Sequence, residues 1–542
     1  MGGPLTRDPT ATFRRLVGLG GLVAVVVAWE LLALYVFAGR NILPTPVAVV
    51  HDMWASRALY WPAVTTTLSE AAQGWLWGNL AAFVVGGLVV GVRTLEGAAL
   101  SIAAMTYCMP IIAIGPIFQV LLAGNEPKVV MAAMSVFFTT LVAVIAGLRS
   151  ADRAMLDLVE VLGGSRRDAL RKVRLPSALP FVLTGLRVAA PAALLGAIIG
   201  EYLGGQQGLG VALISAQQTM DVARAWGVAV AAAALAGIGY GATALVQRIV
   251  SPWSSSMAAG DLMATSPRQP HRGLASRVAL ALLRTGATAG AVIAVWYGAF
   301  ALLHLDPFFA KTPSDLWRFA VSAPGASENR AQLVQASLVT IRDSAIGLAV
   351  GSLAAMALAT ALVLLPQLEH TIMPIALSLR SVPLVAMTPL LVLLFGRGLL
   401  GVSVIVAIVV FFPTLVNMTQ GMRATSAESV LVTRAFGASP WRTLRLVRLP
   451  AAFPALFASA RIAGPAALLG ATLAEWLASG KGLGYLMLNA VTSSDFDLLW
   501  SGVVAVTLIS LAVYALAGFL DTLTSRLLYG AGTAEAAPVT AS

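Results

Sequence analysis

The sequence predicts an all-α polytopic membrane protein of about 12 transmembrane helices, arranged as two parallel six-helix repeats. Three observations predict it: the composition, the number of long apolar segments and an internal repeat. Of 542 residues, 58% are hydrophobic and only 11% are charged, against about 25% in a soluble domain. So few charges cannot cover a soluble globule of this size, which excludes a soluble enzyme and a nucleic-acid-binding protein. The net charge of +11 is better explained by basic cytoplasmic loops.

Twelve apolar segments are long enough to cross a lipid bilayer, because a spanning helix needs about 20 apolar residues. The first is too long for the apolar part of a signal peptide, so a retained span is predicted. The expected spans are 16–38, 64–92, 96–122, 128–148, 177–203 and 225–249 in the first half, and 275–303, 337–365, 371–395, 399–421, 451–477 and 499–527 in the second.

The composition changes between the halves and at the end of the chain. Ser, Pro and Gly dominate 251–273, which predicts a flexible cytoplasmic linker between a first unit, 1–250, and a second unit, 274–530. The small polar residues of 531–542 predict a disordered tail.

The two halves are copies of one unit. Residues 187–210 and 461–484 are identical at 14 of 24 positions with a constant offset of 274. A fixed offset that holds across proline, glycine, arginine and glutamate indicates a tandem duplication. Since six is an even number, both units have the same orientation in the membrane. Further upstream an offset of 273 pairs Thr67 with Thr340, Pro110 with Pro383, and Pro116 with Pro389.

Two long basic loops, 149–176 and 423–450, follow the fourth span of each unit. When they are placed inside, the N-terminus, the linker and the C-terminus are cytoplasmic as well. Each loop predicts an amphipathic helix, a glycine turn and a second basic helix that ends at Leu-Pro. Such an ordered loop on both units indicates a docking surface for a cytoplasmic partner.

With this loop, the chain resembles the permease subunits of type I bacterial ATP-binding-cassette (ABC) importers, whose "EAA" loop carries Glu-Ala-Ala, a glycine and then Leu-Pro. The similarity is greatest to the nitrate/sulfonate/taurine-type branch. Its motifs here are LPTP at 43–46, RSVPLVAMTPLLVLLFGRG at 380–398, FFPTLVNMTQGMR at 411–423, and GLG at 208–210 and 482–484.

The resemblance implies a permease in the bacterial inner membrane that works with two ABC ATPase subunits on the cytoplasmic side and an extracytoplasmic substrate-binding protein. It implies a small anion as substrate, such as a sulfonate, taurine or nitrate, or else a thiamine-precursor or riboflavin-like heterocycle.

The resemblance also assigns the coupling residues. The EAA glutamate corresponds by position to Asp157 in the first loop and to Leu431 in the second. Leu431 keeps no charge, which puts symmetric coupling in doubt and makes the first loop the better candidate. Glu428, one turn earlier, is the alternative acid of the second loop. The candidate coupling residues are Asp157, Glu160, Gly163, Gly164, Leu175, Pro176, Glu428, Gly437, Ala438, Leu449 and Pro450.

Prolines within the third and ninth spans predict broken helices, which membranes tolerate where they line a cavity. Glu201 and Glu475 are ionisable residues near the outer ends of spans five and eleven, where they could contact substrate, a gate or the binding protein, or anchor the outer loop. The candidate path residues are Pro110, Pro116, Gln119, Pro383, Met387, Pro389, Glu201 and Glu475.

The chain is not expected to be an enzyme. The string SGKGLG at 479–484 lacks the spacing of a P-loop, so ATP is expected on partner subunits, and no cofactor is expected on this chain. One cysteine, Cys108, and four scattered histidines form no metal or catalytic cluster. The alternative is a secondary transporter with six-plus-six repeats. Such carriers place their basic loop between spans two and three, where only 91–96 are found.

Overall fold

The computed structural model describes residues 23–529, apart from 24–25, 40–42, 92–94, 252–285, 287–288, 299, 303, 305, 370–371 and 374–383. Within these residues all regular secondary structure is helical. Eight helices of this described part of the chain are long and apolar enough to cross a bilayer, which confirms the all-α membrane fold. They are α3 (Arg57–Gly91), α6 (Glu126–Arg149), α9 (Leu175–Gly204), α11 (Val222–Val250), α14 (Ala326–Leu364), α17 (Leu399–Arg423), α21 (Phe453–Ala474) and α23 (Phe496–Tyr529).

Three other expected spans are described in part. The first includes the apolar helix Val26–Val36, with the π-helical turn η1 (Leu32–Val36), and the seventh includes apolar helical residues within Ala289–Leu302. The ninth contains α16 (Leu384–Phe395). The predicted linker beyond residue 251 and the predicted tail 531–542 lie outside the described residues.

The third expected span, 96–122, is not one straight helix. It divides into α4 (Leu95–Cys108) and α5 (Ile111–Leu121), which meet at an angle of 93°. Pro110 precedes the first turn of α5, where its missing N–H removes no helical hydrogen bond, so the predicted break at this residue is confirmed. Pro116, by contrast, lies inside α5 without ending it. The bend directs α5 across the bundle, so it packs on α9 of its own unit and on α21 of the other.

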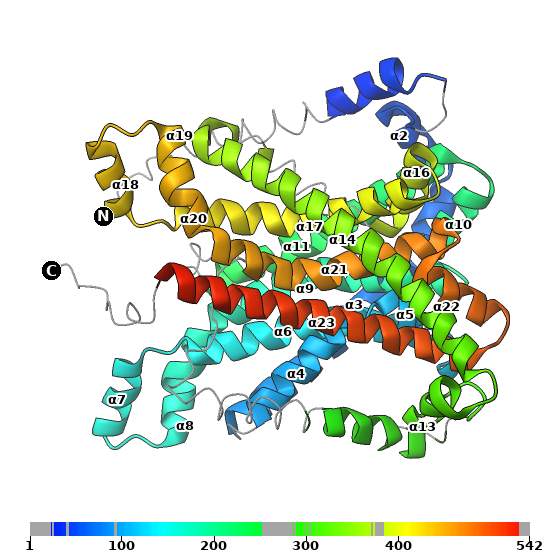
Figure 1. Ribbon diagram of the computed structural model, residues 1–542, viewed down its shortest axis with the longest axis horizontal. Coiled ribbons are helices and arrows are strands. Elements are labelled where there is room, and N and C mark those ends of the chain that lie inside the picture. Colours follow the sequence, from blue (N-terminus) through cyan, green and yellow to red (C-terminus); the bar gives the residue numbers. More distant parts are fainter. Residues whose placement is uncertain are drawn as a thin grey trace, which may run out of the picture.

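Short helices that the sequence did not predict gather at one end of the molecule, and the helices of the two basic loops gather at the other (Figure 1). We call these the clasp end and the loop end. The clasp end has α2 (Pro46–Ala55), α10 (Leu209–Gln218), α13 (Pro313–Trp317) and α22 (Gly482–Thr492). The loop end has α7 (Arg153–Val161), α8 (Arg166–Ala169), α18 (Ala427–Ala435) and α19 (Pro440–Thr443).

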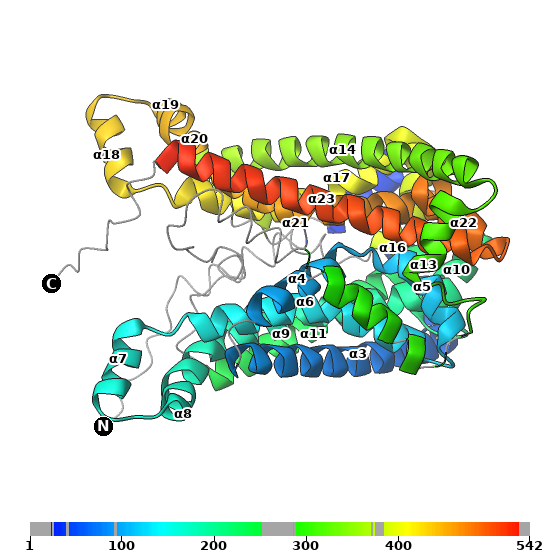
Figure 2. The same cartoon turned by 60° about the horizontal axis from the view of Figure 1, so that its bottom comes forward.

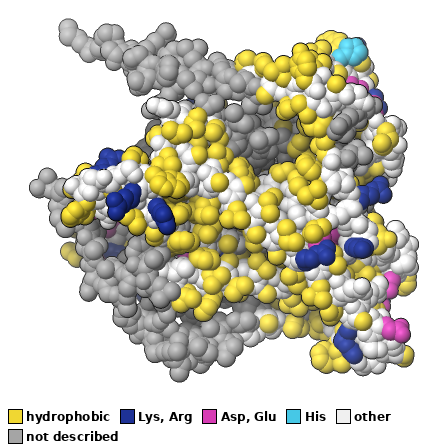
Figure 3. All heavy atoms as spheres, turned by 45° about the horizontal axis from the view of Figure 1, so that its top comes forward, with side chains coloured by type: hydrophobic (Ala, Val, Ile, Leu, Met, Phe, Trp, Pro, Cys, Tyr) yellow, Lys and Arg dark blue, Asp and Glu magenta, His cyan; other side chains and the backbone are white. Residues whose placement is uncertain are grey.

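The two units pack together toward the clasp end and diverge toward the loop end. The largest hydrophobic cluster combines residues of the first unit, including Ile112 and Leu213, with residues of the second, including Leu483 and Phe496. In Figure 2 the helices of the two basic loops lie apart, on opposite sides of the loop end. Figure 3 shows hydrophobic side chains over the middle of one face, with basic side chains toward its two ends, as expected for a surface in contact with lipid.

An aromatic contact repeats between the units and supports the duplication in three dimensions. Trp29 of the first expected span contacts Trp226 of α11 with ring centroids 5.2 Å apart. Trp296 and Trp500 of α23 make the equivalent contact at 5.3 Å. The first span is therefore held against the last helix of its unit in the same way in both halves.

Candidate functional site

The first basic loop is an ordered helix-turn-helix unit. Asp152 caps α7 by accepting a hydrogen bond from the Ala154 N–H at 2.9 Å. The helix ends in a Schellman motif, in which Gly163 N–H donates to the Glu160 carbonyl at 2.9 Å and Gly164 N–H donates to the Val159 carbonyl at 2.8 Å. Gly163 has a φ of +75°, a backbone conformation that favours glycine. The predicted turn is therefore formed.

Gly164 lies in close contact with α7. A Cβ atom there would lie 2.7 Å from the Val159 carbonyl oxygen, so a methyl group would fit in the first loop only after a local shift of the backbone. The next residue, Ser165, then starts α8 through a capping box with Asp168, whose carboxylate accepts from the Ser165 N–H at 3.0 Å.

The second loop has the same geometry but different residues. Gly437 has a φ of +71° and its N–H donates to the Arg434 carbonyl at 2.9 Å. Ala438 takes the place of Gly164, and its N–H donates to the Thr433 carbonyl at 3.1 Å. Ser439 then caps α19 by accepting from the Arg442 N–H at 3.2 Å. The repeated geometry shows that the loop conformation, rather than its side chains, is common to both units.

The prediction that Leu-Pro ends the second helix is wrong in the first loop, whereas in the second loop the helix ends at Ala451, directly after Leu449–Pro450. Leu175 and Leu449 keep helical backbone angles, and the chain continues from α8 through the π-helical turn η2 (Leu170–Arg174) into α9. A π turn spaces its hydrogen bonds by five residues. Because Pro176 and Pro450 follow such a turn as the second residue of the next helix, their missing N–H breaks no helical bond. In the second unit the turn is η6 (Leu444–Arg448), followed by α20 (Leu449–Ala451).

The predicted coupling acids lie on exposed surfaces. Neither α7 nor α18 buries a single residue. Asp157, Glu160 and Glu428 are exposed, and within the described part of the chain they make no hydrogen bond or ion pair. Leu431, at the position of Asp157, is 62% exposed. Beside the acids, an apolar strip on the first loop faces outward without a partner, and it consists of Met155, Leu158, Val161 and Leu162.

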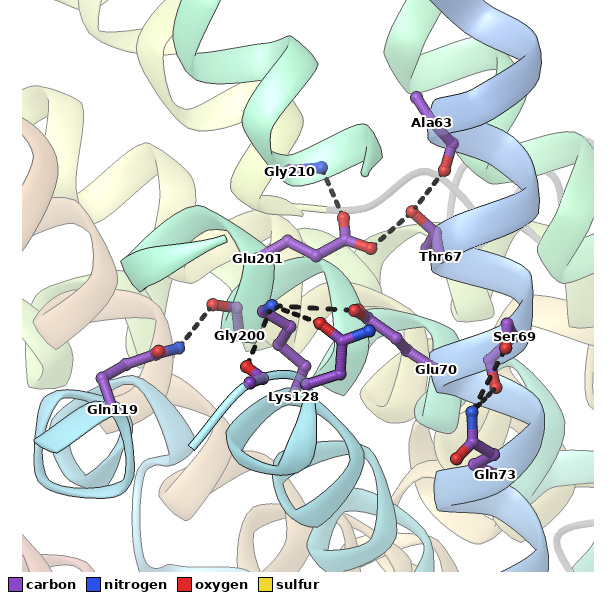
Figure 4. A network of polar contacts seen from close by, with 12 residues as sticks. Ala63, Thr67, Ser69, Glu70, Gln73, Gln119, Lys128, Gly200, Glu201 and Gly210 are labelled. Atoms are coloured by element: carbon purple, nitrogen blue, oxygen red, sulfur yellow. Dashed lines mark hydrogen bonds and ion pairs between the residues drawn. The ribbon is translucent and has the colours of Figure 1, made fainter. Parts of the chain in front are cut away.

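Glu201 organises the clasp end of the first unit (Figure 4). Its carboxylate accepts a hydrogen bond from the Thr67 hydroxyl at 2.6 Å and another from the Gly210 N–H at 2.7 Å. The Thr67 hydroxyl oxygen in turn accepts from the Leu209 N–H at 2.9 Å. These bonds join α3, the end of α9 and the first turn of α10, where a carboxylate also interacts favourably with the helix dipole.

The second unit repeats this clasp. Glu475, in the π-helical turn η7 (Glu475–Ser479), accepts from the Thr340 hydroxyl and from the Gly484 N–H, both at 2.9 Å. The Leu483 N–H donates to Thr340 at 2.9 Å. We use the name clasp for these two sets, Glu201–Thr67–Leu209–Gly210 and Glu475–Thr340–Leu483–Gly484.

Both clasp glutamates are fully buried. Of the roles that the sequence left open for them, anchoring the outer segment is the one supported by these contacts. That Glu201 or Glu475 lines the translocation path stays a prediction.

A buried ion pair near the first clasp was missed from the sequence. Glu70 and Lys128 are 1% and 3% exposed, and their charged atoms are 3.8 Å apart. Lys128 also donates to the Asn125 side-chain oxygen at 3.0 Å. A polar pocket of about 240 Å³ beside this pair is lined by Thr65, Thr66, Ser69, Glu70 and Asn125.

The repeat offset could have revealed part of this pair. An offset of 273 relates Glu70 to Asp343, which is also buried, whereas Lys128 corresponds to Gly401. In the second unit the cation comes instead from the neighbouring Arg342, which forms an ion pair with Asp343 at 2.8 Å.

Two arginines also repeat. Arg187 lies over the ring of Tyr240 at 4.1 Å, and Arg461 lies over the ring of Tyr514 at 4.4 Å. An offset of 274 relates both members of the pair. The cation–π contact attaches the fifth span of each unit to the sixth.

The remaining path residues are placed in packed surroundings. Pro110 and Pro116 are buried, and the Gln119 side-chain amide donates to the Gly200 carbonyl at 3.0 Å, which fixes α5 against α9. Met387 packs against the cluster between α17 and α21. Pro383 lies outside the described residues, as does the side chain of Pro389. Their place on a path stays a prediction.

Comparison with known proteins identifies the type of molecule. The chain matches the family "Binding-protein-dependent transport system inner membrane component" twice, over residues 78–255 and over residues 347–527. The chain belongs to this family. Its two matches correspond to the two units, so it is a tandem fusion of two ABC importer permeases. Members of the family are transport components of the inner membrane rather than enzymes.

Single-unit permeases align with about one third of the fused permease. It is 35% identical over 182 residues to a probable ABC transporter permease protein of Haemophilus influenzae, covering 34% of this chain and 74% of the relative. It is 28% identical over 232 residues to a formylaminopyrimidine transport permease of Halalkalibacterium halodurans, covering 42% and 92%. It is 30% identical over 196 residues to a putative aliphatic sulfonates transport permease of Bacillus subtilis, covering 36% and 65%.

Proposed function

We propose that the fused permease forms the complete translocation pathway of an ABC importer and docks two separate ATP-hydrolysing subunits on its two basic loops. The observation that carries the proposal is the repeated loop geometry. Both loops have a Schellman turn and a helix without a buried residue. The exposed apolar strip beside the acids of the first loop favours a docking partner, because a partner that covers these side chains removes apolar surface from water.

The helical connection from loop to membrane supports coupling. Arg166–Gly204 is a single helical stretch of 39 residues that begins in the first loop and ends near the first clasp. A partner that moves this loop therefore moves α9. Closure of two ATPase subunits would bring the separated loops together and favour an outward-facing state, and their release would favour the inward-facing one.

The orientation of the chain follows from charge. Five arginines in the second loop and seven basic residues in the first support a cytoplasmic loop end. The clasp end would then face the extracytoplasmic side and receive substrate from a binding protein. The N- and C-termini would be cytoplasmic.

The substrate class is a small organic or inorganic solute. Relatives whose names specify riboflavin, formylaminopyrimidine and aliphatic sulfonates favour a riboflavin-like or thiamine-precursor heterocycle or a sulfonate. Taurine and nitrate belong to the same class of small anions as the sulfonates. The chain carries no P-loop of its own, which supports ATP hydrolysis on other polypeptides.

The test is recovery of partners from the native membrane. The tagged, detergent-solubilised permease should bring down an ATPase subunit identified by mass spectrometry. Replacing the apolar strip with Leu158→Ser and Leu162→Ser should reduce that recovery, whereas Arg171→Gln, an exposed change on the same loop, should not. Recovery of the intact chain alone, together with ion-gradient-driven uptake into liposomes without ATP, would instead establish a secondary carrier.

A further inference from the structure

The two loops present different charges at equivalent positions. An offset of 274 relates Asp157 to Leu431 and Glu160 to Arg434. All four residues are exposed, and within the described residues none of them forms an ion pair. Because the helices and turns of the two loops have the same geometry, these side chains project from equivalent places. Where the first loop has Asp157, the second loop thus has a leucine. Where the first loop has Glu160, the second loop has an arginine.

The other loop acids do not alter this contrast. Asp152 caps α7, and Asp168 closes the capping box of α8 and pairs with Lys172 at 3.4 Å. The remaining charge on α7 is that of Arg153, at the start of the helix. On α18 the acid Glu428 lies in the first turn. The ends of the two helices that adjoin the Schellman turns therefore differ most, with two acids on α7 and one base on α18.

The second loop has aromatic side chains where the first has none. Phe436, next to the Schellman glycine, is 86% exposed and corresponds to Leu162. Trp441 is 58% exposed and corresponds to Arg167. Exposed aromatic residues of this size are typical anchors at protein interfaces. The second loop thus offers two exposed aromatic side chains and fewer charges.

We infer that the two loops form non-equivalent docking sites: the first binds a basic groove of its ATPase subunit through Asp157 and Glu160, and the second binds an apolar groove through Phe436 and Trp441. This inference rests on the proposed function, since the occupant of both sites is an ATPase subunit. Charge–charge attraction at an exposed surface is screened by salt, while burial of aromatic side chains is not. The first site is therefore salt-sensitive and the second salt-resistant.

The single native cysteine permits a direct test on the full-length complex. With Cys108 replaced by serine, a cysteine is introduced at Val161 or at its counterpart Ala435, both exposed. Each variant, together with its co-purified ATPase, is treated with a thiol-directed crosslinker at salt concentrations from about 0.05 to about 0.5 M. Crosslinking from position 161 should fall several-fold over this range, and crosslinking from position 435 should change little.

Exchanging the charges supplies the matched control. Asp157→Leu with Glu160→Arg should make the first loop as salt-resistant as the second, and Leu431→Asp with Arg434→Glu should make the second loop salt-sensitive. These positions are exposed on helices without buried residues, so the membrane fold should remain intact by gel filtration. Equal salt profiles from positions 161 and 435 overturn the inference and leave the proposed function intact. Failure of both positions to crosslink an ATPase overturns both.

Discussion

The carboxylate of Glu201 occupies the space into which a side chain at Gly208 would project. Gly208 has a φ of +121°, and a Cβ atom there would overlap the Glu201 carboxylate. Gly482 and Glu475 have the same relationship, with a φ of +90°. The first glycine of each GLG motif is therefore a requirement of the buried glutamate seven residues before it.

Gly208→Ala should destabilise the permease, because the methyl group must displace the carboxylate that holds α10 and because the backbone angle is unfavourable. Strain and a lost buried hydrogen bond each cost about 1–3 kcal/mol. A lowered midpoint of thermal unfolding in detergent would show this. Gly237→Ala is the control, since no atom lies within 4 Å of its Cβ position. Equal midpoints for the two variants would contradict the argument.

Thr67→Val should loosen α10 without a change of volume. The valine removes the donor to Glu201 and the acceptor of the Leu209 N–H, which leaves buried polar groups unpaired at about 1–3 kcal/mol each. Amide hydrogen exchange within Leu209–Gln218 should become faster. Thr67→Ser keeps the hydroxyl and should preserve protection. Equal exchange rates in the Thr67→Val and Thr67→Ser variants would show that the hydroxyl does not hold the clasp.

Lys128→Met should be strongly destabilising, because it leaves the Glu70 carboxylate buried beside Glu201 without its cation. Breaking a buried pair from one side costs about 3–5 kcal/mol. Adding Glu70→Gln should recover part of the loss.

The second unit supplies a comparison for this pair. Arg342→Met should have a smaller effect than Lys128→Met, since the Arg342 side chain is 56% exposed, so that solvent already screens its attraction to Asp343. Unfolding midpoints of the three variants measure the difference. Equal losses from Lys128→Met and Arg342→Met would show that burial does not decide the outcome.

Gly163→Ala should weaken the first Schellman turn by about 1–2 kcal/mol, since its left-handed backbone is unfavourable for any residue with a Cβ. No atom lies within 4 Å of that Cβ position, so the effect is confined to the backbone. Limited proteolysis of the loop and ATP-driven uptake in proteoliposomes should both report it, as faster cleavage and slower uptake. Ala438→Gly, at the following position of the second loop, should change neither.

Much of this architecture could be predicted from the sequence because membrane helices depend on simple rules. Long apolar segments predicted the helices, the constant offset predicted the duplication, and Pro110 predicted a break. The glycine turns at Gly163 and Gly437 were also predictable, since the spacing of helix, glycine and second helix repeats in both loops.

The clasps and the continuous loop helix could not be predicted, because they depend on contacts between distant segments. Thr67 lies 142 residues before Leu209, whose N–H donates a hydrogen bond to the Thr67 hydroxyl. The short helices α10 and α22 are about half the length of a span, so hydropathy does not identify them. Leu175–Pro176 follows the usual rule for a helix end, yet the π turn before it absorbs the missing hydrogen bond.

The unbroken helix from Arg166 to Gly204 also acts as a lever arm. At a rise of about 1.5 Å per residue, its 39 residues extend for roughly 58 Å. A rotation of about 5° around a pivot at the clasp would displace the opposite tip by roughly 5 Å, which is about the pitch of one helical turn. The clasp is fixed by buried hydrogen bonds, while α7 buries no residue. A small rotation of the helix in the membrane would therefore be the same motion as a large displacement of the loop.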